Sequence, residues 1–232
     1  MPEILETLIT CLPNILQAGN FEDWPLKRAL AKIKKGAYKD LTLKARGILQ
    51  DKGEDAYRNF KATLPSFAFN GLFKDKVTNA NFQQSSGLVI LDVDKLSPKR
   101  MQEVKAFLKG QDDVAFLFDS VSGKGLKFAV CVDPALVVDD KSFKAVFAKL
   151  EAYYADNGIT LDASGKDVRR VSFVSYDPDL YHNPNPSYCP LEFNKAGKSE
   201  EEATDEEIEE GFSPLTDDDS ANTISEERRV GK

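Results

Sequence analysis

Apolar residues along the chain follow two spacings, and each spacing predicts a different kind of element. Short apolar and β-branched runs bounded by turn residues predict strands over residues 87–94, 114–118, 125–132 and 168–175. Apolar residues three and four positions apart predict helices over residues 98–108 and 140–157. Elements in this order predict an α+β fold, in which helices pack on a mainly antiparallel sheet.

The first 60 residues have helical spacing, over residues 3–18 and 22–35, and predict a helical N-terminal region. The stretch from Lys27 to Arg46 is also the densest basic part of the chain. We expect it to form either a solvated helix face or a surface that contacts phosphates. After it, aromatic and small residues alternate over residues 66–73, and Asn70-Gly71 is the turn of a predicted hairpin.

The formal net charge of −7 comes from the end of the chain. Residues 195–232 hold 13 acidic and 5 basic residues, which leaves 25 acidic and 26 basic residues before them. Because this last segment also has few apolar residues, we expect a disordered acidic tail or linker. The predicted organisation is a basic helical region over residues 1–60, an α+β core over residues 61–194 and a tail over residues 195–232.

The few cysteines and the single histidine limit the kinds of metal site and disulfide that the chain can form. Cys11, Cys131 and Cys189 are far apart and form no CxxC pair, which argues against a zinc ribbon and a disulfide framework. His182 is the only histidine, so any metal would have to be held by carboxylates. The chain begins without a basic leader and has no apolar run of about 18 residues, so we expect a cytoplasmic protein with no membrane partner.

Two carboxylates end the apolar run that begins at Gly87. Asp92 and Asp94 are two positions apart, so on a strand both side chains project from one face. Carboxylates placed in this way hold Mg²⁺ or Mn²⁺ against phosphate oxygens. The structural alternative is that Asp94 caps the following helix. Burying such charges without a counter-charge is costly, which favours the metal site.

A glycine-rich turn with two hydroxyls and two lysines precedes the strand predicted over residues 125–132. Its spacing is not that of a P-loop, so it is either a simple hairpin turn or a different kind of phosphate contact. Lys127 on the outgoing strand supplies a point charge for phosphate. The candidate nucleotide-binding residues here are Ser120, Ser122, Lys124 and Lys127.

The segment before the last predicted strand adds two acids and two arginines: Asp162, Asp167, Arg169 and Arg170. An acid here completes a metal site and Arg170 grips a triphosphate, or the charges form surface salt bridges. In the first case, Lys127 and Arg170 should lie on the same face as Asp92, across a nucleotide-sized cleft from the carboxylates.

The three motifs in this order, around Asp92, Lys127 and Arg170, resemble the VirE N-terminal domain family over roughly residues 35–194. That family is related to the archaeo-eukaryotic primase superfamily, and the resemblance implies a primase-polymerase-like core. It implies catalytic, metal-binding roles for Asp92, Asp94 and a third acid, for which Asp162 is the best match and Asp167 the second. It also implies nucleoside triphosphates and DNA as partners, in the replication of a mobile element that uses a helicase. The superfamily usually has a histidine where this chain has Lys127, so the lysine would take over the phosphate contact.

Three functions compete. The leading one is a nucleotidyltransferase that makes or extends a primer by a two-metal mechanism. The alternative is a catalytically inactive nucleic-acid-binding module of the same fold. A phosphatase of the haloacid-dehalogenase type is weaker, because Lys95-Leu96 follow the Asp-x-Asp where that family usually has small residues.

Overall fold

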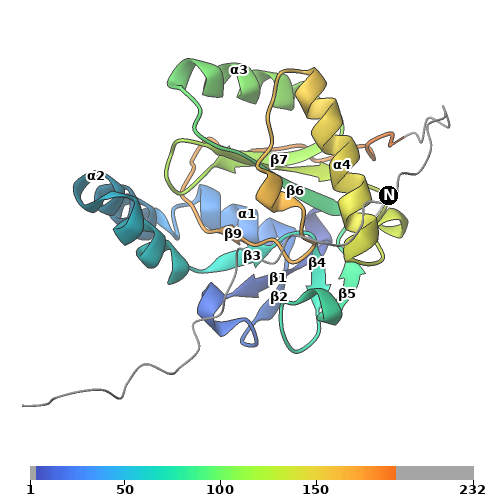
Figure 1. Cartoon of the computed structure of the whole chain (residues 1–232), viewed down its shortest axis with the longest axis horizontal. Coiled ribbons are helices and arrows are strands. Elements are labelled where there is room, and N and C mark those ends of the chain that lie inside the picture. The colour runs from blue at the N-terminus through green and yellow to red at the C-terminus, as the bar shows by residue number, and fades with distance from the viewer. Residues whose placement is uncertain (1–3, 192–232) are drawn as a thin grey trace, which may run out of the picture. The chain divides into compact units, whose positions relative to one another are not determined.

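The computed structural model describes residues 4–191, in which two four-stranded antiparallel sheets and one two-stranded sheet pack with helices (Figure 1). The predicted α+β class is therefore confirmed. The predicted tail over residues 195–232 lies outside the described residues.

In spatial order, the first sheet contains β2 (Glu22–Pro25), β1 (Leu8–Leu12), β3 (Ser66–Ala68) and β9 (Ser172–Phe173). The second sheet contains β10 (Tyr181–His182), β7 (Val114–Asp119), β8 (Leu126–Cys131) and β6 (Leu88–Val93). The third pairs β4 (Gly71–Phe73) with β5 (Phe82–Ser85).

Four α-helices surround the sheets in the described part of the chain: α1 (Leu26–Lys34), α2 (Lys39–Ala62), α3 (Pro98–Lys109) and α4 (Asp140–Asp156). Short 3₁₀ turns lie between the helices and strands along the chain: η1 (Ile4–Glu6), η2 (Ile15–Gln17), η3 (Asn79–Asn81), η4 (Pro134–Leu136) and η5 (Ala163–Gly165). None of the helices within residues 4–191 has the length and apolarity needed to cross a bilayer.

The strand β6 is buried along its whole length because layers cover both faces of its sheet. Val89, Leu91 and Val93 pack in one apolar cluster with residues of α3 and α4. Leu88 and Ile90 belong to a second cluster, with residues of α1 and the first sheet. A strand covered on both sides reads as a continuous apolar run, as this one does until Asp92.

Capping residues explain why the helices α3 and α4 were predicted close to their observed bounds. Ser97 accepts a hydrogen bond from the backbone N–H of Arg100 at the start of α3. Asp139 and Ser142 form a reciprocal capping box at the start of α4. Gly158, with φ of 71°, follows the end of α4 in the left-handed conformation that favours glycine.

The N-terminal prediction was correct for α1 and α2 but wrong before Leu26. Residues 8–12 form the strand β1, which pairs with β2 on one side and β3 on the other. The run Leu-Ile-Thr-Cys-Leu is too short for its spacing to separate a strand from a helix, and pairing decides in favour of the strand. The helix α2 is also not continuous, because Gly53 has φ of 81° and ψ of −174° and separates two helical pieces.

The predicted hairpin over residues 66–73 is wrong in its pairing. The strand β3 pairs with β1 and β9, whereas β4 pairs with β5. Asn70 between them is fully buried, and its side chain accepts from the Ile90 N–H at 2.9 Å and donates to the Val168 carbonyl at 3.0 Å. This side chain therefore ties the turn to the edge strand β6, a role that the local pattern of a hairpin does not reveal.

The last predicted strand, over residues 168–175, shrinks to β9, the two residues Ser172–Phe173. The preceding segment instead forms the turn η5 and an irregular loop that carries Asp162, Asp167 and Arg170. The fold thus brings this loop, β6 and β8 to one place.

Candidate functional site: an ionic cluster at the end of β6 and β8

The centre of the site is a pair of charged residues that face each other across two buried strands. Asp92 of β6 and Lys127 of β8 are register partners in the antiparallel ladder. The Lys127 Nζ lies 2.6 Å from the Asp92 Oδ1, and the two side chains are only 11% and 7% exposed. The expectation that Lys127 lies on the same face as Asp92 is therefore confirmed.

A second cation, Arg170, bridges two carboxylates. Its Nη2 lies 2.9 Å from the Asp92 Oδ2 and 2.9 Å from the Asp162 Oδ2. The backbone N–H of Asp162 also donates to the Asp92 carbonyl at 2.9 Å, which fixes the η5 turn against β6. Three segments that are distant in sequence thus converge on Asp92. We call Asp92, Lys127, Arg170 and Asp162 together the ionic cluster.

The electrostatics of the ionic cluster keep its charges in place. Burial would raise the pKa of the Asp92 carboxyl, but the ammonium of Lys127 and the guanidinium of Arg170 outweigh burial and hold this pKa below its usual range. Burial likewise works against the charge of Arg170, and the carboxylates of Asp92 and Asp162 outweigh it and raise the pKa of Arg170. At neutral pH the cluster is a charged network inside the protein.

Asp94 stands apart from this network. It follows the end of β6, is exposed, and makes no hydrogen bond or ion pair with another residue of the described chain. Its charge favours the charged forms of Arg170 and Lys61, although burial and the other cations still lower the pKa of Lys61. A Cβ at Gly125 would come within 2.7 Å of the Asp94 Oδ1, so glycine is required there. Asp94 is thus a carboxylate open to solvent beside a buried, neutralised one.

The two candidates for the third acid separate clearly. Asp162 joins the ionic cluster through Arg170, and its Oδ1 also accepts from the Ser164 N–H. Asp167 instead pairs with Arg169, whose Nε lies 2.6 Å from the Asp167 Oδ2 at the surface. Of the two, Asp162 is the acid that the fold brings to Asp92.

A divalent metal at Asp92, Asp94 and Asp162 does not fit the arrangement of these side chains. Both oxygens of Asp92 already accept hydrogen bonds, one from Lys127 and one from Arg170. The position between Asp92 and Asp162, where a shared cation would bind, holds the Arg170 Nη2. Residues 4–191 contain no group of three His, Cys, Asp or Glu side chains placed to hold a metal ion. The predicted Mg²⁺ or Mn²⁺ site would therefore need Arg170 to move.

The helix α2 packs against the glycine-rich turn. Arg46 donates from Nε to the Val121 carbonyl at 3.1 Å, and Tyr57 hydrogen-bonds with Ser122. The hydroxyl groups of Ser120 and Ser122 lie 3.0 Å apart. Lys124 at the tip of the turn is exposed. Ser120 and Ser122 thus lie under a helix, with their hydroxyls engaged inside the protein.

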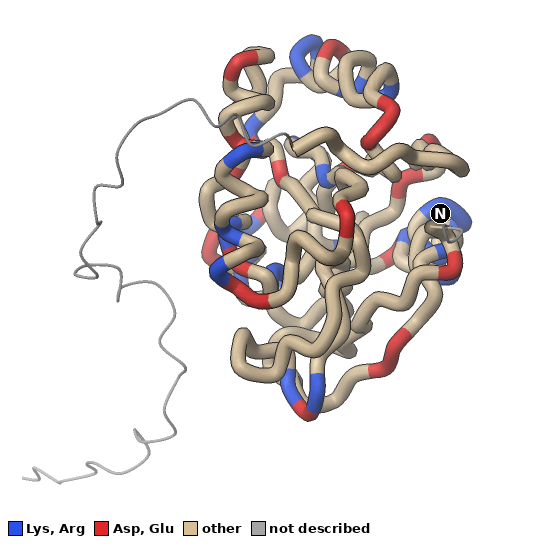
Figure 2. Tube along the Cα trace, turned by 90° about the vertical axis from the view of Figure 1, so that its right-hand side faces the viewer, with Lys and Arg blue, Asp and Glu red and all other residues tan. Residues whose placement is uncertain are grey.

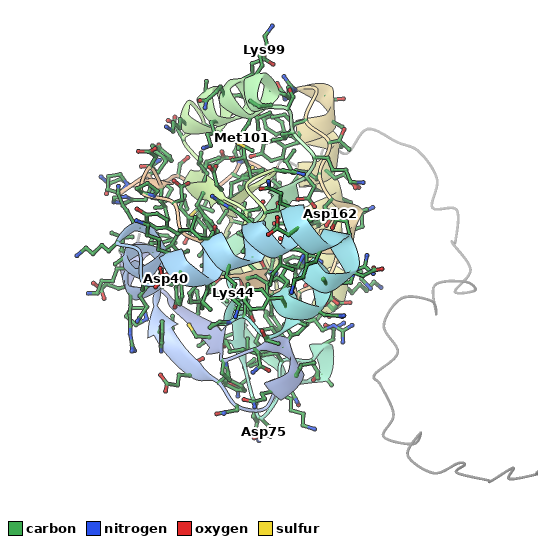
Figure 3. The ribbon with its side chains drawn as sticks, turned by 90° about the vertical axis from the view of Figure 1, so that its left-hand side faces the viewer. Asp40, Lys44, Asp75, Lys99, Met101 and Asp162 are labelled. Atoms are coloured by element: carbon green, nitrogen blue, oxygen red, sulfur yellow. The ribbon has the colours of Figure 1, made fainter. Side chains whose placement is uncertain are left out.

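The C-terminal piece of α2 brings a residue that the motifs did not reveal, Lys61. Its Nζ lies 5.0 Å from the centre of the Phe173 ring and 5.6 Å from that of Tyr57. Burial, and then the positive charges of Lys127 and Arg170, lower the pKa of Lys61. Figure 3 shows the molecule from the side of α2, the helix that carries Lys61, and labels Asp162. No sequence signal distinguishes Lys61 from the other lysines of this basic helix, because its role depends on where α2 packs.

Lys and Arg residues alternate with Asp and Glu residues along the Cα trace in Figure 2, so charge alone does not mark the site. A hollow of about 310 Å³ lies elsewhere, at the opposite end of β6 and β8, beside Gly87, Cys131 and Tyr188. None of its lining residues is charged, so it cannot neutralise a phosphate. The predicted cleft between cations and carboxylates is wrong for Asp92, since Lys127 and Arg170 contact its carboxylate directly.

Comparison with known proteins gives one match. Residues 59–182, more than half of the chain, match the family model described as BT4734-like, N-terminal domain. This is a different family from the VirE N-terminal domains, so the family assignment made from the motifs was wrong. No curated protein and no solved structure matches the chain. The matched region includes every residue of the ionic cluster.

Proposed function

The chain belongs to the family of BT4734-like N-terminal domains, and we propose that it binds a nucleoside triphosphate at the ionic cluster and transfers its nucleotidyl group to a nucleic-acid primer. The observation that carries this proposal is the convergence of Lys127 and Arg170 on Asp92 from three separate segments. The family description names no activity, so the proposal rests on the chemistry of these side chains.

The burial of this network supports a functional reading. A buried ion pair is weak evidence for stability, because the loss of hydration offsets much of the attraction. The neighbouring pairs in the ladder of β6 and β8 are apolar, so pairing of the two strands does not require charged residues at the position of Asp92 and Lys127. The two cations of the ionic cluster, Lys127 and Arg170, are groups that can contact the oxygens of a highly charged ligand such as a triphosphate.

The reaction sets a role for each group. The 3′-hydroxyl of a primer forms a bond to the α-phosphorus, pyrophosphate leaves, and the hydroxyl proton passes to a base or to water. Lys127 and Arg170 would neutralise phosphate oxygens as charge moves to the pyrophosphate. Asp94, which is exposed and without an ion pair among the described residues, is the carboxylate placed to accept the proton.

The experiment is a primer-extension assay with labelled nucleoside triphosphates, supplied with Mg²⁺ or Mn²⁺. We expect extension by the wild type and a fall of at least about 100-fold for Lys127→Ala, comparable to the loss of one oxyanion-hole donor. Lys105→Ala is the matched control, because Lys105 forms an equally short pair, 2.6 Å, with Asp119 outside the ionic cluster. Extension that falls equally in both variants, or in neither, would refute the proposal.

One observation favours a second candidate, a nucleic-acid-binding module without catalysis. Both oxygens of Asp92 are engaged by cations, so this carboxylate is not available to a metal unless Arg170 moves. In this case the domain would bind DNA through its cations and leave catalysis to a partner. Binding of DNA with no extension under any metal condition would select this candidate.

The remaining expectations belong to the same proposal. Mg²⁺ or Mn²⁺ as cofactor, DNA as template or primer, a helicase of the same mobile-element replication system, and a cytoplasmic location all stay predictions. Ser120, Ser122 and Lys124 stay candidates for nucleotide contacts through the turn that α2 covers.

A further inference from the structure

Lys61 is a partly buried cation that acts on the ionic cluster and has no carboxylate partner in the described chain. Lys127 and Arg170 each lie within 2.9 Å of a carboxylate oxygen of Asp92. No ion pair or hydrogen bond joins Lys61 to any residue among those described, and its Nζ instead lies over the rings of Phe173 and Tyr57. The rings offer weak attraction to an ammonium and no hydrogen-bond acceptor of full charge.

Two cations and two carboxylates lie close enough to Lys61 to act on its charge. The groups that act on it are Lys127 of β8, Arg170 of the loop before β9, and Asp94 and Asp92 of β6. After burial, the two cations have the largest effects, and together they lower the pKa of Lys61. Like charges gathered in a partly buried place are unfavourable in the free protein, and they are stabilised when an anion enters.

An independent observation in the same cluster also calls for an acceptor. The Nε of Arg170 is buried and has no hydrogen-bond partner, although the Nη2 of the same guanidinium binds two carboxylates. A buried donor left without an acceptor is unfavourable, so such groups normally have a partner. An anion that accepts from this donor and from Lys61 would satisfy both.

We propose that Lys61 and Arg170 together form the subsite for the phosphate groups of the ligand, with Lys61 as the residue that the polyphosphate contacts first. That this polyphosphate belongs to a nucleotide rests on the proposed function; the anion subsite itself does not. In the free protein Lys127 is paired with Asp92, and Lys61 adds a cation that no carboxylate of the described chain engages. The subsite takes the class of ligand that carries several phosphate charges.

The test uses inorganic triphosphate and ATP as separate probes of the whole chain, each measured by calorimetry without added metal. Lys61→Met should weaken the binding of triphosphate about 10- to 100-fold, the effect of one hydrogen bond to a charged group. Lys61→Arg should retain most of the affinity, because it keeps the charge. Lys44→Met is the matched control: Lys44 is also on α2 and over an aromatic ring, Phe60, but is exposed and outside the ionic cluster.

Thermal unfolding separates this role from a structural one. Removal of Lys61 relieves repulsion from Lys127 and Arg170, so Lys61→Met should unfold at the same or a higher temperature. A second readout needs no variant: the side-chain amine signal of Lys61 in NMR should shift when triphosphate is added to the wild type.

Each outcome of these experiments either supports or overturns the phosphate subsite. Triphosphate affinity that is equal in Lys61→Met and wild type, or an unmoved Lys61 signal, overturns the subsite and leaves the primer-extension proposal intact. A wild type that binds no triphosphate overturns the subsite as well. Binding that depends on Lys61 together with no primer extension supports the subsite and removes the proposed activity.

Discussion

Two parts of the same β-ladder differ sharply in their side-chain chemistry. Along one face of β6 and β8, Leu88 faces Cys131 and Ile90 faces Ala129, and these four residues belong to one apolar cluster. Two residues further along the same face, Asp92 faces Lys127. Both parts are buried and have the same backbone geometry, so the difference lies in side-chain chemistry alone.

The apolar part stabilises the fold by removing surface from water, at about 25 cal/mol per Å². The ionic part gains attraction but loses hydration, and its net contribution is near zero or unfavourable compared with an apolar pair. Within one ladder, the neighbouring apolar pairs therefore show that charges are not required for strand pairing. We infer that the charges serve binding.

The largest effect should come from breaking the ionic pair on one side. Asp92→Ala leaves the Lys127 ammonium buried beside Arg170 without its carboxylate, and it should lower the free energy of unfolding by about 3–5 kcal/mol. Ile90→Val in the apolar part is the control, with an expected loss of about 0.5–1.5 kcal/mol. Urea unfolding of both variants measures the contrast. Equal losses would show that the two parts of the ladder do not differ as described.

A smaller loss is expected at the residue that anchors the apolar part. Asn70→Ala removes the partners of the Ile90 N–H and the Val168 carbonyl, which should cost about 2–4 kcal/mol. The partly exposed Asn183, which donates to the Asp112 carbonyl, provides a control with an expected change within about 0.5 kcal/mol on substitution by alanine. Because Asn70 does not contact the ionic cluster, triphosphate binding by folded Asn70→Ala should remain as in the wild type.

The smallest effect concerns pH. The pKa of Asp92 is lower in the folded chain than in the unfolded chain, so its contribution to stability is present above the unfolded value and disappears as pH falls through the folded value. The wild type should therefore lose stability below about pH 4 more steeply than a chain with an apolar pair in place of Asp92 and Lys127. Unfolding curves at several acidic pH values compare the slopes; identical slopes would contradict the charged state of Asp92.

The sequence predicted those elements whose signals are local. Apolar runs indicated β6, β7 and β8, and apolar spacing indicated α3 and α4, whose starts are capped in the structure by Ser97 and Asp139. The strand β1 and the pairing of β3 with β9 were missed, because partners distant in sequence determine them. Long-range pairing is not contained in the spacing of a five-residue run.

In the site, too, the features with local sequence signals were predicted and those that depend on packing were not. Strand alternation and motif order predicted that Asp92, Lys127 and Arg170 would lie on one face. The contact between them, which replaces the expected cleft, depends on side-chain lengths across the finished sheet. Lys61 and Tyr57 were missed because the packing of α2 over the turn at Ser122 brings them there.

The central claim is that Asp92 and Lys127 are kept for ligand binding and not for stability. The double variant Asp92→Leu, Lys127→Met tests it most directly, because it replaces the pair by apolar residues and leaves Arg170 its partner Asp162. Urea unfolding and ATP calorimetry on the same sample should give a free energy of unfolding equal to the wild type or up to about 4 kcal/mol higher. ATP affinity should fall by at least about 10-fold. A double variant that unfolds more easily than wild type while it binds ATP unchanged would contradict the account.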